Sequence, residues 1–449
     1  MTEVRRGPTR FAPAAVEVQP LPGGGMLLRS PQKLGSYPPR LGEHLRRWAL
    51  EAPDRTWLAE RDARGEWRRV SYAEALRSVE ALAQALLGRG LSSRTPAMFL
   101  SENSVDFGLL AMACLYIGVP VAPVSPAYSL VSQDHAKLRY VFDLVKPKLV
   151  YVSRGTPFAK ALAALPLDGV EVVVSADPVE GRRSTLFADL LSTRSTADVE
   201  AAFEQIGPDS LAKILFTSGS TGMPKGVMNT HRMMCSNQQS IAQIWPFVEE
   251  RPPVFVDWLP WNHTFGGNKT FNLVLRNGGT LYIDHGKALP GAIEKTVANL
   301  REISPTIYWN VPKGYDILLP YLEADRELRE SFFRELDLLF YAAAALPQNL
   351  WARLEKLSLE TRGELVPMAS GWGSTETSPS ITMVHYPISQ AGIIGIPMPG
   401  IEVKLLPNAG KLEMRVRGPN VTPGYYGQED ITRDSFDEEG FFRMGDAGK

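Results

Sequence analysis

The sequence predicts an α/β protein with two doubly wound parallel sheets and a small β-barrel-like subdomain. Helix-like and strand-like segments alternate over residues 41–391, which is the pattern of a parallel sheet covered by helices on both faces. Beyond residue 391, glycines and prolines precede two short alternating segments at 402–406 and 411–416, which is typical of a small antiparallel sheet. With 449 residues and 44% hydrophobic content, the chain can bury the core of several subdomains.

The first 40 residues are dense in Pro, Gly and Arg, which predicts an extended arm with little helix. A first α/β subdomain is expected over residues 41–205. Its predicted helices span 41–52 and 72–89, and its predicted strands span 97–100, 148–152 and 171–175.

A second α/β subdomain is expected over residues 206–391, followed by the small β subdomain over 392–449. The predicted strands of the second subdomain span 213–217, 280–284, 306–309, 336–341 and 365–369.

An apolar stretch over residues 107–126 approaches the length of a membrane span. Pro120 and Pro123 interrupt it, so a buried helix over 107–117 followed by a short buried strand is favoured. The first 25 residues contain arginines and prolines without a continuous apolar core, so they do not resemble a signal peptide. We therefore expect no membrane span.

Charge and cysteine content exclude several classes of protein. The net charge of −1 gives no field that would attract nucleic acid or an anionic membrane. Two cysteines provide no disulfide framework, and six scattered histidines show no paired metal-ligand spacing. This composition suits a reducing cytoplasm.

The most informative segment is a loop rich in hydroxyl side chains and glycine that ends in a lysine. It comprises Thr217, Ser218, Gly219, Ser220, Thr221, Gly222 and, three residues on, Lys225. Backbone N–H groups, hydroxyls and an ammonium group together suit a polyphosphate. The loop follows a predicted strand at 212–216 and precedes a predicted helix at 227–245, the order of a nucleotide site. It is not a P-loop, because Pro224 stands where the second glycine is required. A plain Ser/Gly turn is the alternative interpretation.

Four further clusters contain candidate site residues. Trp258, Trp261 and Phe265 surround His263, and Trp309 offers another flat surface. Residues 342–345 are four alanines, Gly371 to Glu376 combine glycines, hydroxyls, an indole and a carboxylate, and Asp446 lies on a predicted turn. The structural alternatives are a half-buried histidine, a core tryptophan at Trp372 and tight packing at the alanines.

Taken together, these motifs resemble those of the acyl-adenylate-forming superfamily, which includes acyl-CoA synthetases, luciferases and peptide-synthetase adenylation domains. The loop at 217–226, the Gly371-Trp372-Gly373-Ser374-Thr375-Glu376 segment and the 418–426 segment upstream of Asp446 carry the resemblance. The sequence around 258–267, 310–312 and 341–347 is most similar to bacterial feruloyl-CoA synthetases. The fold implied is the large N-terminal domain of adenylate-forming enzymes.

The resemblance also implies roles for individual residues. Loop residues 217–222 and Lys225 would contact the ATP phosphates, Thr375 the α-phosphate, and Glu376 would bind Mg²⁺. Trp372 would stack on adenine against Ala344 and Ala345, and Asp446 would hold the ribose. His263 would lie between the acid and the entering thiol. The remaining implied contacts are Gly373 with the nucleotide, Gly371 with both nucleotide and acid, and Trp258, Trp261, Phe265 and Trp309 with the acid.

The resemblance implies an ATP-dependent acid–CoA ligase, with ATP and CoA as co-substrates and a hydroxycinnamic acid such as ferulate as the acid. Alternatives are a fatty-acyl ligase, or a nucleotide-binding module without turnover. An amino-acid adenylation domain is disfavoured, because the Asn262 to Phe265 segment lacks the aspartate that pairs with an ammonium group. A homodimer is left open. The family's C-terminal lid domain, with its catalytic lysine, cannot be assigned, so slow turnover is expected.

Overall fold

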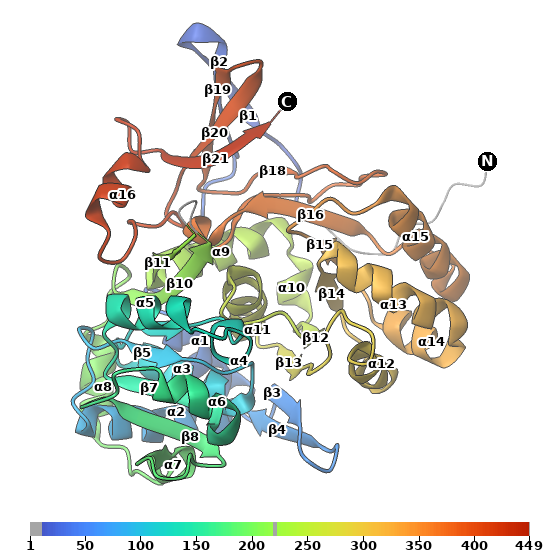
Figure 1. Ribbon diagram of the computed structural model, residues 1–449. Helices are drawn as coiled ribbons and strands as arrows, with labels where there is room; N and C mark the ends of the chain where they lie inside the picture. The colour runs from blue at the N-terminus through green and yellow to red at the C-terminus, as the bar shows by residue number, and fades with distance from the viewer. Residues whose placement is uncertain (1–10, 219–221, 449) are drawn as a thin grey trace.

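Four β-sheets organise the part of the chain that the computed structural model describes, residues 11–218 and 222–448 (Figure 1). The first sheet has the order β11-β10-β6-β5-β7-β8-β9, and its neighbours are parallel except for β10 and β11. Its strands are β5 (Ala97–Phe99), β6 (Val121–Pro123), β7 (Leu149–Arg154), β8 (Glu171–Ala176), β9 (Thr185–Leu186), β10 (Leu211–Ser218) and β11 (Pro224–Thr230).

Helices cover both faces of this sheet. They are α1 (Gly42–Glu51), α2 (Tyr72–Gly88), α3 (Val105–Tyr116), α4 (Ala127–Leu130), α5 (Ala136–Val145), α6 (Gly155–Ala163), α7 (Phe187–Leu191) and α8 (Ala197–Glu204). Successive strand residues enter different cores, since side chains alternate along a strand. Met98 packs in one cluster with residues of α5 and α6, whereas Phe99 packs in another with residues of α2 and α3. The doubly wound arrangement predicted for this region is confirmed.

The apolar segment that needed a membrane check is the buried helix α3, whose residues are all buried except Asp106. It packs between α2 and the first sheet. Among the described residues, the molecule has no helix with the length and hydropathy needed to cross a membrane.

Strands from both predicted α/β subdomains share the second sheet. It has the order β12-β13-β3-β4 and consists of β3 (Thr56–Arg61), β4 (Trp67–Ser71), β12 (Val254–Asp257) and β13 (Thr280–Ile283). Leu281 of β13 pairs in parallel with Leu58 of β3. The predicted boundary at residue 205 therefore separates strands that lie in one sheet.

The third sheet contains the strands that lead to the candidate site. It has the order β14-β15-β16-β17-β18, and it is parallel from β14 to β16 and antiparallel beyond. Its strands are β14 (Ile307–Asn310), β15 (Leu338–Tyr341), β16 (Met368–Gly373), β17 (Ser380–Met383) and β18 (Ile396–Pro397).

Two separate cores cover the faces of the third sheet, as predicted for a second doubly wound subdomain. One face packs on α12 (Ile293–Glu302), α13 (Pro312–Ala324), α14 (Arg326–Arg334) and α15 (Gln348–Arg362). The other face joins the large core that includes α9 (His231–Ile244), α10 (Phe247–Glu250) and α11 (Phe271–Arg276). Tyr308 enters the first core, and its neighbour Trp309 enters the second.

The fourth sheet joins the two ends of the described chain. Strands β1 (Glu17–Leu21) and β2 (Gly25–Arg29), linked by a short 3-10 turn η1 (Pro22–Gly24), extend the antiparallel strands β19 (Glu402–Asn408), β20 (Lys411–Arg417) and β21 (Phe442–Gly448). In Figure 1 these blue and red strands rise together from the rest of the molecule. The N-terminal segment is therefore not only an extended arm, because it supplies two strands.

The predicted β-barrel-like closure is wrong for the described residues. The fourth sheet has the order β1-β2-β19-β20-β21, and its edge strands β1 and β21 do not pair with each other. Five strands whose registers follow one another across a single layer form an open sheet.

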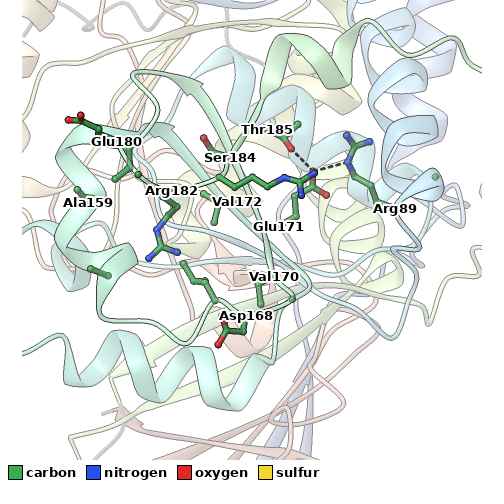
Figure 2. Close-up of a pocket in the computed structure, with 17 residues that line it drawn as sticks. Arg89, Ala159, Asp168, Val170, Glu171, Val172, Glu180, Arg182, Ser184 and Thr185 are labelled. Carbon is green, nitrogen blue, oxygen red and sulfur yellow. Dashed lines mark hydrogen bonds and ion pairs between the residues drawn. The ribbon is translucent and has the colours of Figure 1, made fainter.

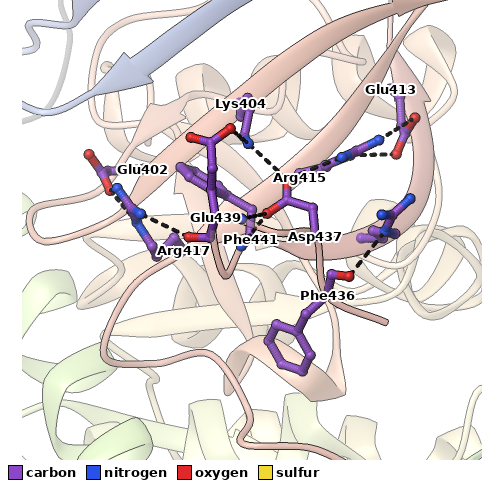
Figure 3. A network of polar contacts seen from close by, with 10 residues as sticks. Glu402, Lys404, Glu413, Arg415, Arg417, Phe436, Asp437, Glu439 and Phe441 are labelled. Atoms are coloured by element: carbon purple, nitrogen blue, oxygen red, sulfur yellow. Dashed lines mark hydrogen bonds and ion pairs between the residues drawn. The ribbon is translucent and has the colours of Figure 1, made fainter. Parts of the chain in front are cut away.

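A buried ionic cluster fixes the loop that leads into β21 (Figure 3). Asp437 accepts hydrogen bonds from Lys404 Nζ at 2.7 Å, Arg415 Nη1 at 3.1 Å and the Phe441 backbone N–H at 2.8 Å. Burial alone would raise the pKa of Asp437, but these hydrogen bonds outweigh it and lower the pKa to about 2. Because the loop between Asp437 and Phe441 immediately precedes β21, the cluster also positions the strand that carries Asp446.

We predict that Asp437→Asn destabilises the protein at neutral pH by about 2 kcal/mol, since a lowered carboxyl pKa measures stabilisation of the charged form. That contribution is present above the unfolded-state pKa of about 4 and is lost as the pH falls toward 2. Melting midpoints of wild type and variant should therefore converge below about pH 4. The exposed Asp434→Asn is the control, expected to change little at any pH. A deficit for Asp437→Asn that is independent of pH would contradict this assignment.

Candidate nucleotide and acyl site

The predicted phosphate loop lies between two antiparallel strands. Thr217 near the end of β10 pairs with Lys225 near the start of β11, so both residues flank the loop. Gly222 adopts a left-handed conformation with φ of 81°, which favours glycine. Gly219, Ser220 and Thr221 lie outside the described residues.

The predicted helix over residues 227–245 is wrong at its beginning. Residues up to Thr230 pair with β10, and α9 begins only at His231, where the Thr230 side chain accepts the Met233 N–H. The loop is therefore the turn of a hairpin and not the N-terminus of a helix. The predicted contact with phosphate therefore relies on the N–H groups and hydroxyls of the loop and on Lys225, without help from a helix dipole.

Trp372 and Asp446, which are 74 residues apart, meet through a hydrogen bond. The indole Nε1–H of Trp372 on β16 donates to Asp446 Oδ2 on β21 at 2.9 Å. Asp446 is exposed and Trp372 is half-buried. The structure thus brings together the two residues that the sequence resemblance assigned to adenine and ribose.

Ala344 and Ala345 are exposed in the segment that follows β15. Parallel pairing places Tyr341 at the end of β15 beside Ser370 of β16. Because the carboxyl ends of parallel strands meet at one edge, both alanines leave the sheet at the edge where Gly371 and Trp372 lie. Their contact with adenine stays a prediction.

Close packing explains two glycines of this segment. A Cβ atom on Gly371 would lie 2.7 Å from the Thr382 carbonyl oxygen, and one on Gly373 would overlap the Pro379 carbonyl oxygen. Both neighbouring groups are backbone and cannot rotate away. Any larger residue would therefore displace the turn that leads to Glu376.

Glu376 lies on a 3-10 turn, η3 (Thr375–Thr377), with buried Thr375 beside it. The Tyr425 hydroxyl donates to Glu376 Oε1 at 2.9 Å, and the Thr422 N–H donates to the Glu376 carbonyl at 2.8 Å. Lys225 Nζ lies 5.2 Å from the centre of the Tyr425 ring, which links the phosphate hairpin to the carboxylate. Tyr425 was not among the predicted site residues, although it belongs to the 418–426 segment that carried the resemblance.

His263 lies just before a π-helix, Phe265–Thr270, a rare element that often occurs at functional sites. Its Nδ1 accepts the Phe265 backbone N–H at 3.2 Å, so a neutral ring carries its proton on Nε2. The side chain reaches solvent, but neighbouring protein atoms exclude enough water to lower the pKa of His263 below 6.5. The imidazole is therefore neutral at pH 7.

The aromatic residues predicted to bind the acid differ in burial. Trp258 is half-buried, whereas Trp261, Phe265 and Trp309 are buried at 5%, 5% and 2% exposure. The Trp261 ring packs against Phe107 and Phe271, with centroids 5.4 and 4.9 Å away. The ring centroids of Phe265 and Trp309 lie 5.8 Å apart, and the ring planes are tilted by 53°. Trp261 thus belongs to the core, and its contact with a substrate stays a prediction.

A buried polar network connects the β10–β11 hairpin (the phosphate hairpin), the π-helix and the turn that carries Glu376. Lys213 Nζ on β10 donates to the Gly267 carbonyl at 2.7 Å and to Asn268 Oδ1 at 3.2 Å. Asn268 Nδ2 donates to Asn229 Oδ1 on β11 at 2.7 Å, and Ser378 Oγ donates to the same oxygen at 3.1 Å. This network was not predicted from the sequence. The one sequence signal for it is that asparagines occur at buried positions of apolar segments.

An open hollow of about 1060 Å³ lies elsewhere in the molecule (Figure 2). It borders β8 and the segment before β9, and its lining includes Asp168, Glu180, Arg182 and Arg183. Glu171 within it pairs with Arg89 at 2.8 Å and accepts from Thr185 at 2.7 Å. None of the predicted site residues lines this hollow.

Comparison with known proteins identifies the family. The sequence signature of "AMP-binding enzyme" matches residues 45–426. The chain belongs to the AMP-binding enzyme family. An ATP-bound crystal structure of MatB from Rhodopseudomonas palustris superposes with a TM-score of 0.67 at 25% identity, covering 90% of this AMP-binding chain and 76% of that one.

Three curated relatives illustrate the range of the family. "4-coumarate--CoA ligase-like 9" from Arabidopsis thaliana is 27% identical over 84% of this chain and 64% of its own length. "Feruloyl-CoA synthase" from Amycolatopsis sp is 25% identical over 84% of this chain and 70% of its own length. "Long-chain-fatty-acid--CoA ligase" from Escherichia coli is 28% identical over 81% of this chain and 69% of its own length. The chain thus spans less than two thirds of the first relative, and less than half of two other plant relatives.

We predict that Asn268→Ala destabilises the AMP-binding enzyme by about 2–3 kcal/mol, since it removes two buried hydrogen bonds, one from Lys213 and one to Asn229. Ser378→Ala removes a single hydrogen bond and should cost about 1 kcal/mol. Thermal melting compares the two variants. Equal, small effects would show that the asparagine bridge does not hold the three segments together.

Proposed function

We propose that this chain is the nucleotide- and acid-binding part of an ATP-dependent carboxylic acid–CoA ligase. Such an enzyme forms an acyl-AMP and then an acyl-CoA thioester. The single observation that best supports the proposal is the hydrogen bond between Trp372 and Asp446. It places an aromatic plate beside a carboxylate at the edge of the third sheet, where carboxyl ends of parallel strands receive ligands in α/β proteins.

The proposed nucleotide contacts follow from this placement. The Trp372 indole stacks on adenine against Ala344 and Ala345, and Asp446 accepts hydrogen bonds from the ribose hydroxyls. The phosphates extend from there toward Thr375 and the β10–β11 hairpin. The hairpin contributes Thr217, Ser218, the loop over 219–222 and Lys225, which provide hydroxyl and N–H donors and one positive charge.

Glu376 is better suited to binding a divalent cation than to a purely structural role. Tyr425 occupies one carboxylate oxygen, and among the described residues no hydrogen bond or ion pair satisfies Oε2. The described residues include no group of three or more His, Cys, Asp or Glu side chains that could hold a metal. Mg²⁺ is commonly held by one carboxylate together with substrate phosphates, and it would neutralise phosphoryl charge when bound.

The chemistry needs no side-chain nucleophile. In the first step a carboxylate oxygen of the acid attacks the α-phosphorus, the bond to the bridging oxygen breaks, and pyrophosphate leaves. In the second step the CoA sulfur attacks the acyl carbon, and AMP leaves with the electron pair of the anhydride bond. Lys225 and Thr375 stabilise charge on the phosphoryl oxygens, and positioning supplies much of the remaining rate.

We assign His263 to the boundary between the acid and the thiol. A neutral imidazole whose Nδ1 already accepts a hydrogen bond presents Nε2–H as a donor. This group can orient the acid carboxylate without adding a positive charge. The lowered pKa of His263 keeps this state over the neutral pH range.

The proposed acid is aromatic, with a hydroxycinnamic acid such as ferulate as the first choice. The half-buried Trp258 offers a flat surface five residues before His263, and it packs against the buried cluster that contains the rings of Phe265 and Trp309. The similarity to a feruloyl-CoA synthase adds support, and the similarity to a fatty-acid ligase keeps a fatty acid as the alternative. We place the reaction in the cytoplasm, where ATP and CoA are available. The free thiols of Cys114 and Cys235 agree with a reducing compartment.

We predict that Trp372→Phe and Asp446→Ala each weaken ATP binding by about 5- to 20-fold, since each removes the hydrogen bond between the indole and the carboxylate. The effects should not multiply in the double variant, because both changes break the same interaction. Isothermal titration calorimetry measures the dissociation constants, and Asp434→Asn serves as a surface control. Full multiplicativity would mean that Trp372 does not position Asp446.

The reaction class and substrate are tested by acid-dependent exchange of pyrophosphate into ATP, using cinnamic, benzoic and fatty acids. Aromatic acids should stimulate exchange, and Glu376→Gln should lower it about 100-fold and raise the Mg²⁺ concentration required. Exchange with a fatty acid alone would overturn the aromatic assignment. Absence of exchange with every acid, together with intact ATP binding, would favour a nucleotide-binding module.

A further inference from the structure

Lys269 is a buried amine that the fold leaves without an acceptor. It lies on the π-helix six residues after His263 and is 2% exposed. Among the described residues, its Nζ has no carboxylate or oxygen partner; its one hydrogen-bond contact is Met383 Sδ at 3.8 Å. Burial therefore lowers the pKa of Lys269 well below its ordinary value.

Aromatic rings surround this amine. Its Nζ lies 3.7 Å from the centre of the Phe340 ring, 5.4 Å from Trp309, 5.7 Å from Trp245 and 5.9 Å from Phe265. Ring faces attract a cation, but they supply no hydrogen-bond acceptor of the strength of an oxygen. A lysine buried in this way costs stability unless something else compensates.

The neighbouring Lys213 shows how the same fold treats a structural lysine. It is also buried, yet its ammonium donates to the Gly267 carbonyl and to Asn268 Oδ1. Lys269 belongs to the π-helix and Lys213 contacts it, and Lys213 has two oxygen acceptors within the protein. The contrast indicates that Lys269 keeps its donor capacity for a group that the protein itself does not supply.

The surroundings of Lys269 point toward the acyl site. Phe265 lies two residues after His263, and Phe340 and Trp309 are paired on β15 and β14, one residue before the ends of those strands. Met383 pairs with Gly371, and a Cβ on Gly371 would lie 3.1 Å from Met383 Cγ. Methionine is flexible and can give way to a ligand. A ligand that enters past His263 and Gly371 would therefore meet Lys269 at its far end.

We propose that Lys269 binds the phenolic oxygen of the acid substrate and makes the enzyme selective for aromatic acids that carry a hydroxyl group at the end opposite the carboxylate. This inference rests on the proposed function. A phenol suits the site because its ring can pack on Phe265 and Trp309 while its oxygen reaches the amine. A phenolic O–H can donate to a neutral amine, and a phenolic oxygen can accept from an ammonium group, so the pair forms in either protonation state.

The test compares binding of cinnamate and 4-hydroxycinnamate to wild type and Lys269→Met by calorimetry in the presence of AMP. Wild type should bind the hydroxylated acid about 10- to 100-fold more tightly, since a site built to bond a hydroxyl rejects the analogue without it. In Lys269→Met this ratio should fall to about 1 through weaker binding of the hydroxylated acid, with cinnamate binding retained.

Thermal melting distinguishes selectivity from a structural role. Lys269→Met should leave the melting temperature unchanged or raise it, because it removes a buried amine that lacks an oxygen partner. The matched variant Lys213→Met should lower the melting temperature, because it strands the Gly267 carbonyl and Asn268. A large drop in melting temperature for Lys269→Met, with the acid ratio preserved, would overturn the proposal.

The remaining outcomes separate this inference from the proposed function. If wild type binds both aromatic acids and Lys269→Met leaves their ratio unchanged, the role of Lys269 is wrong while the aromatic assignment survives. If wild type binds neither aromatic acid but binds a fatty acid, the aromatic function itself is wrong. If 4-carboxycinnamate depends on Lys269 and 4-hydroxycinnamate does not, the partner is a second carboxylate, and the phenol assignment is overturned.

Discussion

The geometry of the candidate site depends on the hydrogen bond between Asn268 and Asn229. Through it, the π-helix that follows His263 is tied to the phosphate hairpin, and Ser378 ties the Glu376 turn to the same oxygen. All three residues are buried, where an unpaired amide or hydroxyl is costly. No segment can therefore shift far without leaving polar groups of the other two exposed or without a hydrogen-bond partner. The regions proposed to bind the acid and the phosphates are consequently held together by the protein itself, and such preorganisation is what electrostatic catalysis requires.

The π-helix supplies polar groups to two separate buried environments. The Gly267 carbonyl accepts a hydrogen bond from Lys213, while Asn268 and Lys269 are both buried, at 0% and 2% exposure. The element thus sends one polar residue to the network and the next to the aromatic cluster of Phe340 and Trp309.

Local patterns in the sequence predicted most of the individual elements, because strands such as β5, β7 and β8 are short apolar segments between amphipathic helices. They failed where structure is set by pairing between distant segments. Residues 224–230 adopt a strand because they pair along β10, although Pro224, Gly226 and Asn229 give little local β preference. Motif recognition located Trp372, Glu376 and Asp446 but not their partners, since Tyr425 and Asn229 act through contacts that span 49 and 149 residues. The subdomain boundaries stay a prediction.

The position of Asp446 depends on parts of the chain that no local pattern connects to it. Asp446 lies on β21, at the edge of the fourth sheet, and β21 is held by β20 and by the Lys404–Asp437 contact. Strand β19 in turn pairs on its other side with β2, so the N-terminal strands complete the sheet that supports the ribose-binding candidate. Trp372 joins this sheet to the third sheet by a hydrogen bond, and apolar residues of both sheets, such as Val403 and Met383, belong to the same buried core. Asp446 is therefore held by apolar packing between the third and fourth sheets as well as by the hydrogen bond from Trp372, so its position depends on strands from both ends of the described chain.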